Sequence, residues 1–178
     1  KRLKPYEDKV TIVKGNFADI ASILQGLNID KVNGIVLDLG VSSHQIDTEG
    51  RGFSYMSEDA PLDMRMDREA RLTAEDIVND YSYEDLLRVL KVYGEERFAP
   101  NIARNICKIR DTKRIKTTGE LNKIIDDSIP TKNKTKGGHP SKRTFQALRI
   151  ELNGELDILE NSINDMIDLL VHDGRLCV

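Results

Sequence analysis

Apolar and polar positions alternate near the start of the chain and then repeat with a helical period. Residues 9–16 (KVTIVKGN) alternate and are rich in β-branched side chains, which predicts a strand. Residues 17–27 carry apolar side chains at helical spacing, and the apolar run at 34–37 (GIVL) predicts a second, buried strand. The strand-helix-strand order predicts a parallel pair with a right-handed crossover, the unit of a doubly wound α/β sheet.

The apolar period is helical from about residue 73 onward. Four helices are predicted in succession, and their starts lie at Thr73, Ser82, Pro100 and Thr117. Asp76 and Glu120 stand where the third residue of a capping box is expected. Residues 131–142 form a basic loop, and the apolar stripe at 145–170 predicts a further helical segment, broken near Asn153.

The α/β pattern resumes at the end of the chain, where Asp173-Gly174 predicts a turn into a strand at 175–178. We therefore expect an α/β sheet in residues 1–48, an inserted helical lobe in 49–137 and a return to the sheet in 138–178. We expect the last strand to need further residues to complete the sheet, and no glycine-rich nucleotide loop stands in residues 1–8, before the first predicted strand. We expect a fragment of a longer protein, incomplete at both ends.

The composition favours one cytoplasmic domain with a small lobe. The 178 residues are 39% hydrophobic and 32% charged, no window approaches about 18 uninterrupted apolar residues, and no signal peptide is recognisable. No membrane partner is expected. Cys107 and Cys177 have no neighbours at metal-ligand spacing, so neither a disulfide framework nor a metal site is expected.

The net charge of −3 conceals an uneven distribution. Residues 97–143 hold thirteen Lys or Arg against four acids, a local balance of +9. Such a segment predicts a basic face for a polyanion, and the alternative is an ordinary solvated surface.

The candidate chemistry lies in residues 34–67. Asp38 ends the second predicted strand and precedes the turn GVSS at 40–43, and ligands of open α/β sheets bind beyond the carboxyl ends of the strands. A second polar cluster contains Asp63 and Arg65. The alternatives are a capping or turn role for Asp38 and a local salt bridge for the Asp63–Arg65 pair.

Three segments together resemble one family: residues 34–67 (with DLGVSS, RGFSY and PLDMRMD), 93–98 (YGEERF) and 139–150 (HPSKRTFQALRI). They resemble the bacterial MraW family, S-adenosylmethionine-dependent methyltransferases acting on the N4 amine of a cytosine in 16S ribosomal RNA. The resemblance covers nearly the whole chain, with His44 and Pro100 as departures. It implies a class I, Rossmann-like methyltransferase sheet, here incomplete at both ends, with an inserted all-helical substrate lobe.

The resemblance also implies roles for individual residues. Phe17, Asp38 and Gln45 fall on positions that contact the cofactor S-adenosylmethionine, although Phe17 has a core role as its alternative. The family's glycine-rich loop and ribose-binding acid would precede residue 1, so we expect the fragment to bind cofactor weakly and to be inactive. Asp38 is the expected catalytic acceptor for an N–H of the target amine, and the sequence leaves open whether it only holds the cofactor.

The expected partner is 16S ribosomal RNA of the small subunit, and not DNA. The target base must leave its stack, so single-stranded or flipped RNA is the expected substrate. Seven residues are candidates for holding it: Ser42, Ser43, Asp63 and Gln146 through the base or ribose, and Arg65, Arg97 and Arg143 through phosphates. Neither cysteine lies in a site-like loop, so no covalent intermediate is expected.

Two other functions remain open. A non-catalytic RNA-binding or ribosome-assembly module would need the basic lobe but not Asp38. A dinucleotide-dependent oxidoreductase would share the strand-helix-strand unit but would not need a basic lobe. The sequence does not fix the oligomeric state.

Overall fold

The protein is α/β and divides into two compact units. A computed structural model describes residues 3–48, 50–134 and 138–178. One unit, here the sheet unit, joins Lys1–Leu39 to Leu156–Val178, and the other, the helical unit, is Gly40–Glu155. None of the described helices is both long and apolar enough to cross a membrane.

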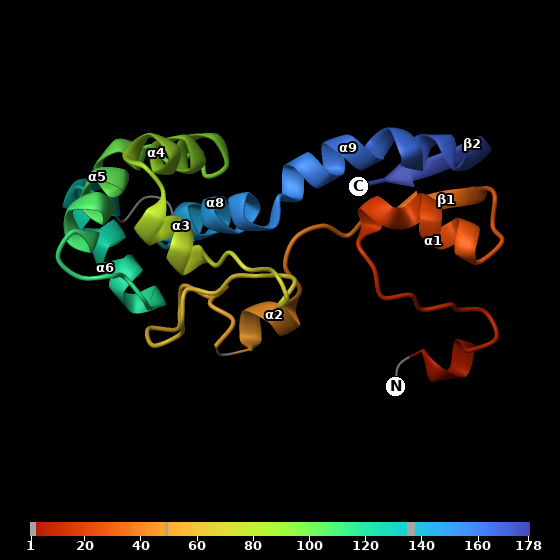
Figure 1. Cartoon of the computed structure of the whole chain (residues 1–178), viewed down its shortest axis with the longest axis horizontal. Helices are drawn as coiled ribbons and strands as arrows, with labels where there is room; N and C mark the ends of the chain where they lie inside the picture. Colours follow the sequence, from red (N-terminus) through yellow and green to blue (C-terminus); the bar gives the residue numbers. More distant parts are fainter. Residues whose placement is uncertain (1–2, 49, 135–137) are drawn as a thin grey trace. The chain divides into compact units, whose positions relative to one another are not determined.

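The sheet unit is built on two parallel strands, β1 (Val32–Val36) and β2 (Leu170–Cys177) (Figure 1). Val32 pairs with Leu170, and Gly34 pairs with Arg175 after a bulge in the register. The bulge contains Asp173, whose φ of 63° lies in the left-handed region. Four helices belong to the described part of this unit: η1 (Lys4–Tyr6), η2 (Phe17–Asp19) and α1 (Ile20–Gly26) come before β1, and most of α9 (Glu155–Asp168) comes before β2.

The strand predicted at residues 9–16 is wrong. The structure assigns no strand there, and Val10, Ile12 and Val13 are exposed. A strand needs a neighbour to satisfy its backbone groups, and in the described sheet β1 pairs with β2 alone. The parallel pair therefore joins residues more than 130 positions apart, and the helix predicted at 17–27 is confirmed as η2 and α1.

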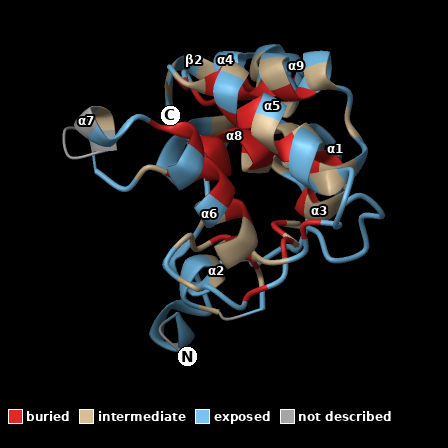
Figure 2. Ribbon diagram, turned by 90° about the vertical axis from the view of Figure 1, so that its left-hand side faces the viewer, coloured by how far each residue is buried: buried red, intermediate tan, exposed pale blue. Residues whose placement is uncertain are grey.

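The helical unit holds most of the buried apolar side chains (Figure 2). Its seven described helices are α2 (Ser43–Asp47), α3 (Ala74–Asp80), α4 (Tyr83–Val92), α5 (Ala99–Arg110), α6 (Thr118–Ser128), α7 (Thr131–Lys134) and α8 (Lys142–Asn153). The core is formed by residues on one face of α3, α4, α5, α6 and α8, such as Ile77, Leu90, Ile102, Leu121 and Leu148, all fully buried.

The predicted helix starts are confirmed. Side-chain caps, which are local contacts, begin α3, α4 and α6, whereas α5 begins at Ala99, beside the predicted Pro100, without such a cap. Thr73 accepts a hydrogen bond from the Asp76 N–H at 3.3 Å, and the Asp76 carboxylate accepts from the Thr73 N–H at 2.9 Å. Thr117 and Glu120 form the same capping box at α6. The expected break near Asn153 is also confirmed: α8 ends at Gly154, whose φ is 59°.

Helix α8 packs closely against the end of α4. A Cβ on Gly94 would lie 2.8 Å from the Arg143 carbonyl oxygen, so only glycine allows this approach. The Glu151 carboxylate of α8 accepts from Arg88 of α4 at 2.8 Å and from the hydroxyl of Tyr81, which ends α3, at 3.1 Å. Helix α8 thus belongs to the helical unit, whereas the sequence pattern assigned residues 138–155 to the sheet.

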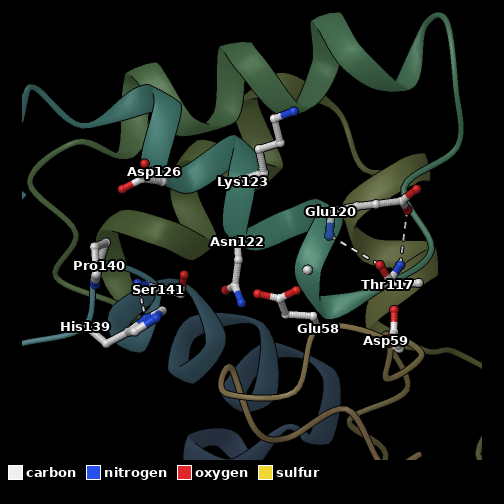
Figure 3. Close-up of a pocket in the computed structure, with 11 residues that line it drawn as sticks. Glu58, Asp59, Thr117, Glu120, Asn122, Lys123, Asp126, His139, Pro140 and Ser141 are labelled. Carbon is white, nitrogen blue, oxygen red and sulfur yellow. Dashed lines mark hydrogen bonds between the residues drawn. The ribbon is translucent and has the colours of Figure 1, made fainter.

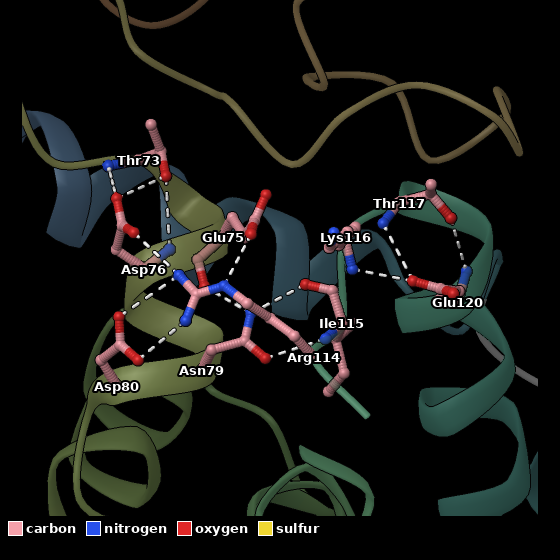
Figure 4. Close-up of polar contacts among 10 residues, drawn as sticks. All are labelled: Thr73, Glu75, Asp76, Asn79, Asp80, Arg114, Ile115, Lys116, Thr117 and Glu120. Carbon is pink, nitrogen blue, oxygen red and sulfur yellow. Dashed lines mark hydrogen bonds and ion pairs between the residues drawn. The ribbon is translucent and has the colours of Figure 1, made fainter. Parts of the chain in front are cut away.

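A polar clasp joins α3 to the segment before α6 (Figure 4). The Asn79 amide exchanges two hydrogen bonds of 2.8 Å with the backbone of Ile115. Arg114 lies beside it and pairs with three carboxylates of α3, those of Glu75 at 2.7 Å, Asp76 at 3.0 Å and Asp80 at 3.0 Å. These ion pairs raise the pKa of the Arg114 guanidinium above its ordinary value.

Candidate functional site

Asp38 lies in the sheet unit just beyond the carboxyl end of β1. The last rung of the parallel pair is the Leu37 N–H, which donates to the Cys177 carbonyl at 2.8 Å. The Asp38 side chain that follows is exposed, and no hydrogen bond within the described chain uses its carboxylate. Phe17, in the same unit, begins η2 and is half-buried. The carboxylate is therefore open to a ligand.

The residues after Asp38 cap a short helix in the helical unit. Ser42 is the N-cap of α2, and its side chain accepts from the Gln45 N–H at 3.3 Å. The side-chain oxygen of Gln45, Oε1, accepts in return from the Ser42 N–H at 2.9 Å. Ser43 is exposed at the start of α2. The polar groups of Ser42 and Gln45 thus have a capping role here.

Asp63 and Arg65 form a local salt bridge, which was the alternative to a role in holding the RNA. Arg65 donates from Nε and Nη2 to the two carboxylate oxygens at 3.0 and 2.8 Å, and from Nη1 to the carbonyls of Arg68 and Ala70. Burial opposes ionisation of Asp63, yet the hydrogen bonds and charge of Arg65 hold its pKa below the ordinary value. The pair fixes its own loop, and both side chains stay about one-fifth exposed, 22% and 23%.

Three other predicted residues surround the turn at 93–98. Arg143 donates to the Glu95 carbonyl at 2.8 Å, and Gln146 donates to the Tyr93 carbonyl over a long 3.5 Å. Arg97 lies in the turn, with its guanidinium carbon 5.7 Å from the centre of the Phe98 ring. All three side chains are exposed. The structure thus brings together residues from the second and third motif segments.

A pocket of about 290 Å³ opens in the helical unit beside Gln146. Its buried floor is Phe53, Met64 and Phe145, and Tyr55 meets Phe145 edge-on with ring centres 6.0 Å apart. Its remaining lining residues are Val41, Ile46, Ser54, Met56, Lys142 and Arg149. Of the predicted site residues only Gln146 lines this pocket. The aromatic residues stood in the RGFSY and HPSKRTFQALRI motifs, but their convergence is a tertiary property.

Asn153 holds the wall of this pocket in place from α8. Its amide nitrogen donates to the carbonyls of Met64 at 3.0 Å and Arg149 at 2.8 Å, and its oxygen accepts from the Met66 N–H at 2.7 Å. Met64 between these bonds has a φ of 55°, a conformation that non-glycine residues rarely adopt. From the sequence alone, Asn153 was predicted only to break the helix.

A second, more polar pocket of about 500 Å³ lies between α6 and the start of α8 (Figure 3). Glu58 and Asn122 point toward each other across it, and Asn122 also donates to the Tyr55 carbonyl at 2.7 Å. His139 lines this pocket and stacks on Tyr55, with ring centres 4.5 Å apart. The Tyr55–His139 stack therefore connects the linings of the two pockets. No group of His, Cys, Asp and Glu in the described part of the chain could hold a metal ion.

The basic segment is partly used within the fold. Arg114 pairs with three carboxylates, Lys113 pairs with Glu120, and Arg110 donates to the Val78 carbonyl. Other cations, including Lys108 and Lys142, are exposed and make no ion pair among the described residues. The segment thus combines structural cations with solvated ones.

Comparison with known proteins decides the family. A model of the MraW methylase family matches residues 1–178, the whole chain. The chain belongs to the MraW methylase family. The resemblance drawn from the three motif segments is therefore confirmed.

Curated proteins similar to this MraW-family chain carry one type of name. Ribosomal RNA small subunit methyltransferase H 2 of Agathobacter rectalis is 58% identical over the whole chain, which covers 57% of that protein. Ribosomal RNA small subunit methyltransferase H of Lachnospira eligens is 57% identical, with 56% of its length covered. The protein of that name from Clostridium botulinum (strain Kyoto) is 55% identical, with 57% covered. The chain spans little more than half of these relatives.

Proposed function

We propose that the protein is an S-adenosylmethionine-dependent methyltransferase of ribosomal RNA, acting on the N4 amine of a cytosine in 16S RNA of the small subunit. The whole-chain match to the MraW methylase family carries this proposal. In this proposal β1 and β2 belong to a class I methyltransferase sheet, the helical unit is the RNA-binding lobe, and the protein acts in the cytoplasm.

The residues at the end of β1 fit a cationic cofactor. S-adenosylmethionine supplies an electrophilic methyl group on a positively charged sulfur and carries an amino group. The exposed, unpaired Asp38 carboxylate suits such charges, and Phe17 in the same unit supplies a half-buried ring. Gln45 is the third candidate, since its capping bonds use its carbonyl oxygen and leave the amide N–H groups for a ligand.

Asp38 is also the candidate acceptor for the target amine. The lone pair of a cytosine amine is delocalised into the ring, so the amine is a weak nucleophile. A carboxylate that accepts one of its N–H groups stabilises the positive charge that develops on nitrogen during transfer. We propose this role for Asp38 and propose substrate contacts for Ser42, Ser43, Asp63, Arg65, Arg97, Arg143 and Gln146.

The experiment is transfer of labelled methyl groups to small ribosomal subunits by the protein at its full natural length. We expect Asp38→Asn to retain the fold and to lower the rate by at least about 100-fold, because an amide cannot replace the carboxylate as a charged acceptor. Asp30→Asn, at another exposed aspartate of the sheet unit, is the control and should leave the rate unchanged. Equal rates for the Asp38 variant and the wild type would reject the catalytic role. RNA binding without any transfer by the wild type would favour the assembly module.

A further inference from the structure

We infer that the pocket lined by Phe53, Tyr55, Phe145 and Gln146, here called the aromatic pocket, receives one unstacked base of the RNA substrate. This inference rests on the proposed function and locates a site for it. The pocket lies entirely within the helical unit, and at about 290 Å³ it is near the lower limit of ordinary ligand pockets. A single base with its sugar is a ligand of suitable size.

The mouth of the pocket is apolar and open to water. Met56 is 73% exposed and Ile46 is 41% exposed, next to the buried ring of Phe145. Large apolar side chains gathered at the mouth of a cavity mark a binding surface, because leaving them in water is unfavourable. The flat face of a base would cover them. The Tyr55 ring beside them stacks on His139 with one face and offers its remaining surface to a base.

Polar groups stand where the edge of a base could be recognised. Among the described residues the Gln146 amide makes one hydrogen bond, a long one, so its side-chain carbonyl oxygen and a second N–H remain for a ligand. Cytosine presents a donor and acceptors side by side on its pairing edge, and an amide can match both. The Ser54 hydroxyl accepts from the Met56 N–H at 3.2 Å and keeps its own proton to donate.

The charge at the rim favours RNA over the cofactor. Lys142 is exposed and has no anionic partner among the described residues, and Arg149 presents Nη1 while its other two nitrogens bind Glu155. A polyanionic strand gains from the Lys142 charge and from a phosphate hydrogen bond to Arg149 Nη1. S-adenosylmethionine carries a sulfonium, an ammonium and one carboxylate, so its net charge is positive and the Lys142 ammonium would repel it.

Fluorescence anisotropy with two RNA probes tests the inference. One probe is a short sugar-phosphate chain whose single base is a central cytosine, and the other is the same chain without any base. Wild-type protein should bind the cytosine probe more tightly, and the ratio of the two affinities isolates the base. Tyr55→Ala should reduce this ratio by about fivefold or more, and Gln146→Ala by about fivefold. Both variants should bind the abasic probe with the affinity of the wild type.

The matched control is Gln25→Ala, a glutamine in the exposed face of α1 in the sheet unit, which should leave the ratio unchanged. Gln146 is exposed, so its variant should fold even if Tyr55→Ala does not. An unchanged ratio in the Gln146 variant, or displacement of the cytosine probe by S-adenosylmethionine alone, would overturn the inference. Methyl transfer measured in parallel separates the two proposals. If the variants keep the wild-type affinity ratio while the wild type is active, only the pocket is rejected. If the variants have a reduced ratio while the wild type is inactive, only the activity is rejected.

Discussion

Single residues fix the backbone that forms the wall of the aromatic pocket. Gly52 has a φ of 69°, and a Cβ there would lie 2.2 Å from the Pro61 carbonyl oxygen and 2.9 Å from the Asp63 nitrogen. Gly50 has a φ of 83° but open space around it. The two positions thus share a left-handed backbone and differ in their neighbours.

We therefore expect Gly52→Ala to lower the free energy of unfolding by about 3 kcal/mol or more, because strain and a backbone clash add. Gly50→Ala should cost only about 1 kcal/mol, from the strained backbone alone. Urea denaturation of both variants gives the comparison. Equal costs would show that the backbone near Gly52 moves to accept a side chain.

Asn153 should matter more than an ordinary helical asparagine. Two of its three hydrogen bonds hold Met64 and Met66 against α8, and the third joins the Arg149 carbonyl within α8. Each bond is worth about 1 kcal/mol. Asn153→Ala should therefore lower the free energy of unfolding by about 3 kcal/mol. Asn101→Ala is the control, because within the described part of the chain the exposed Asn101 side chain accepts one long hydrogen bond, from Arg104 at 3.5 Å. A cost below about 1 kcal/mol for Asn153→Ala would mean that the segment containing Met64 and Met66 keeps its conformation without these hydrogen bonds.

Helix starts were predictable at the scale of elements, and the attachments between elements were not. A helix cap joins residues three positions apart in the chain. Thr73, Ser82 and Thr117 therefore predicted the starts of α3, α4 and α6 from the sequence. The clasp of Asn79 and Arg114 joins residues 34 to 39 positions apart. The same basic segment that suggested a polyanion site thus supplies Arg114 to the fold.

The hydrogen bonds of Asn79 and the ion pairs of Arg114 should respond differently to salt. Asn79→Ala removes two neutral hydrogen bonds to Ile115 and one to the Glu75 carbonyl, so it should cost about 2 to 3 kcal/mol at any salt concentration. Arg114→Gln removes ion pairs of a side chain that is 41% exposed, and its effect should shrink between low salt and 1 M salt. Thermal unfolding at two salt concentrations measures both. A salt-independent Arg114 effect would assign that side chain a packing role.

Acid should destabilise the whole molecule through carboxylates held in ionised form. The pKa of Asp76 is lowered mainly by its hydrogen bonds from Thr73, and that of Glu120 mainly by Lys113. The Asp63 pKa is lowered by Arg65 against the effect of burial. A carboxylate whose folded pKa lies below its unfolded value contributes stability above the unfolded value and loses it as the pH falls through the folded one.

We expect the unfolding midpoint to be steady near neutral pH and to fall steeply below about pH 4, the region of ordinary carboxylate pKa values. Asp76→Asn should reduce this acid dependence, because the amide cannot be protonated. Urea titrations at a series of pH values test this. An equally steep fall in the variant would place the acid sensitivity in other groups.

The sequence by itself determined the family, the helix starts, the break at Gly154 and the strand that presents Asp38. These depend on motif order, on contacts between near neighbours, or on the period of apolar positions. Tertiary structure alone decided that β1 pairs with β2, that α8 packs in the helical unit, and that Phe53, Tyr55 and Phe145 line one pocket with Gln146. The alternation at 9–16 predicted a strand wrongly, because a strand needs a neighbouring strand to pair with and only the tertiary structure determines which segments pair.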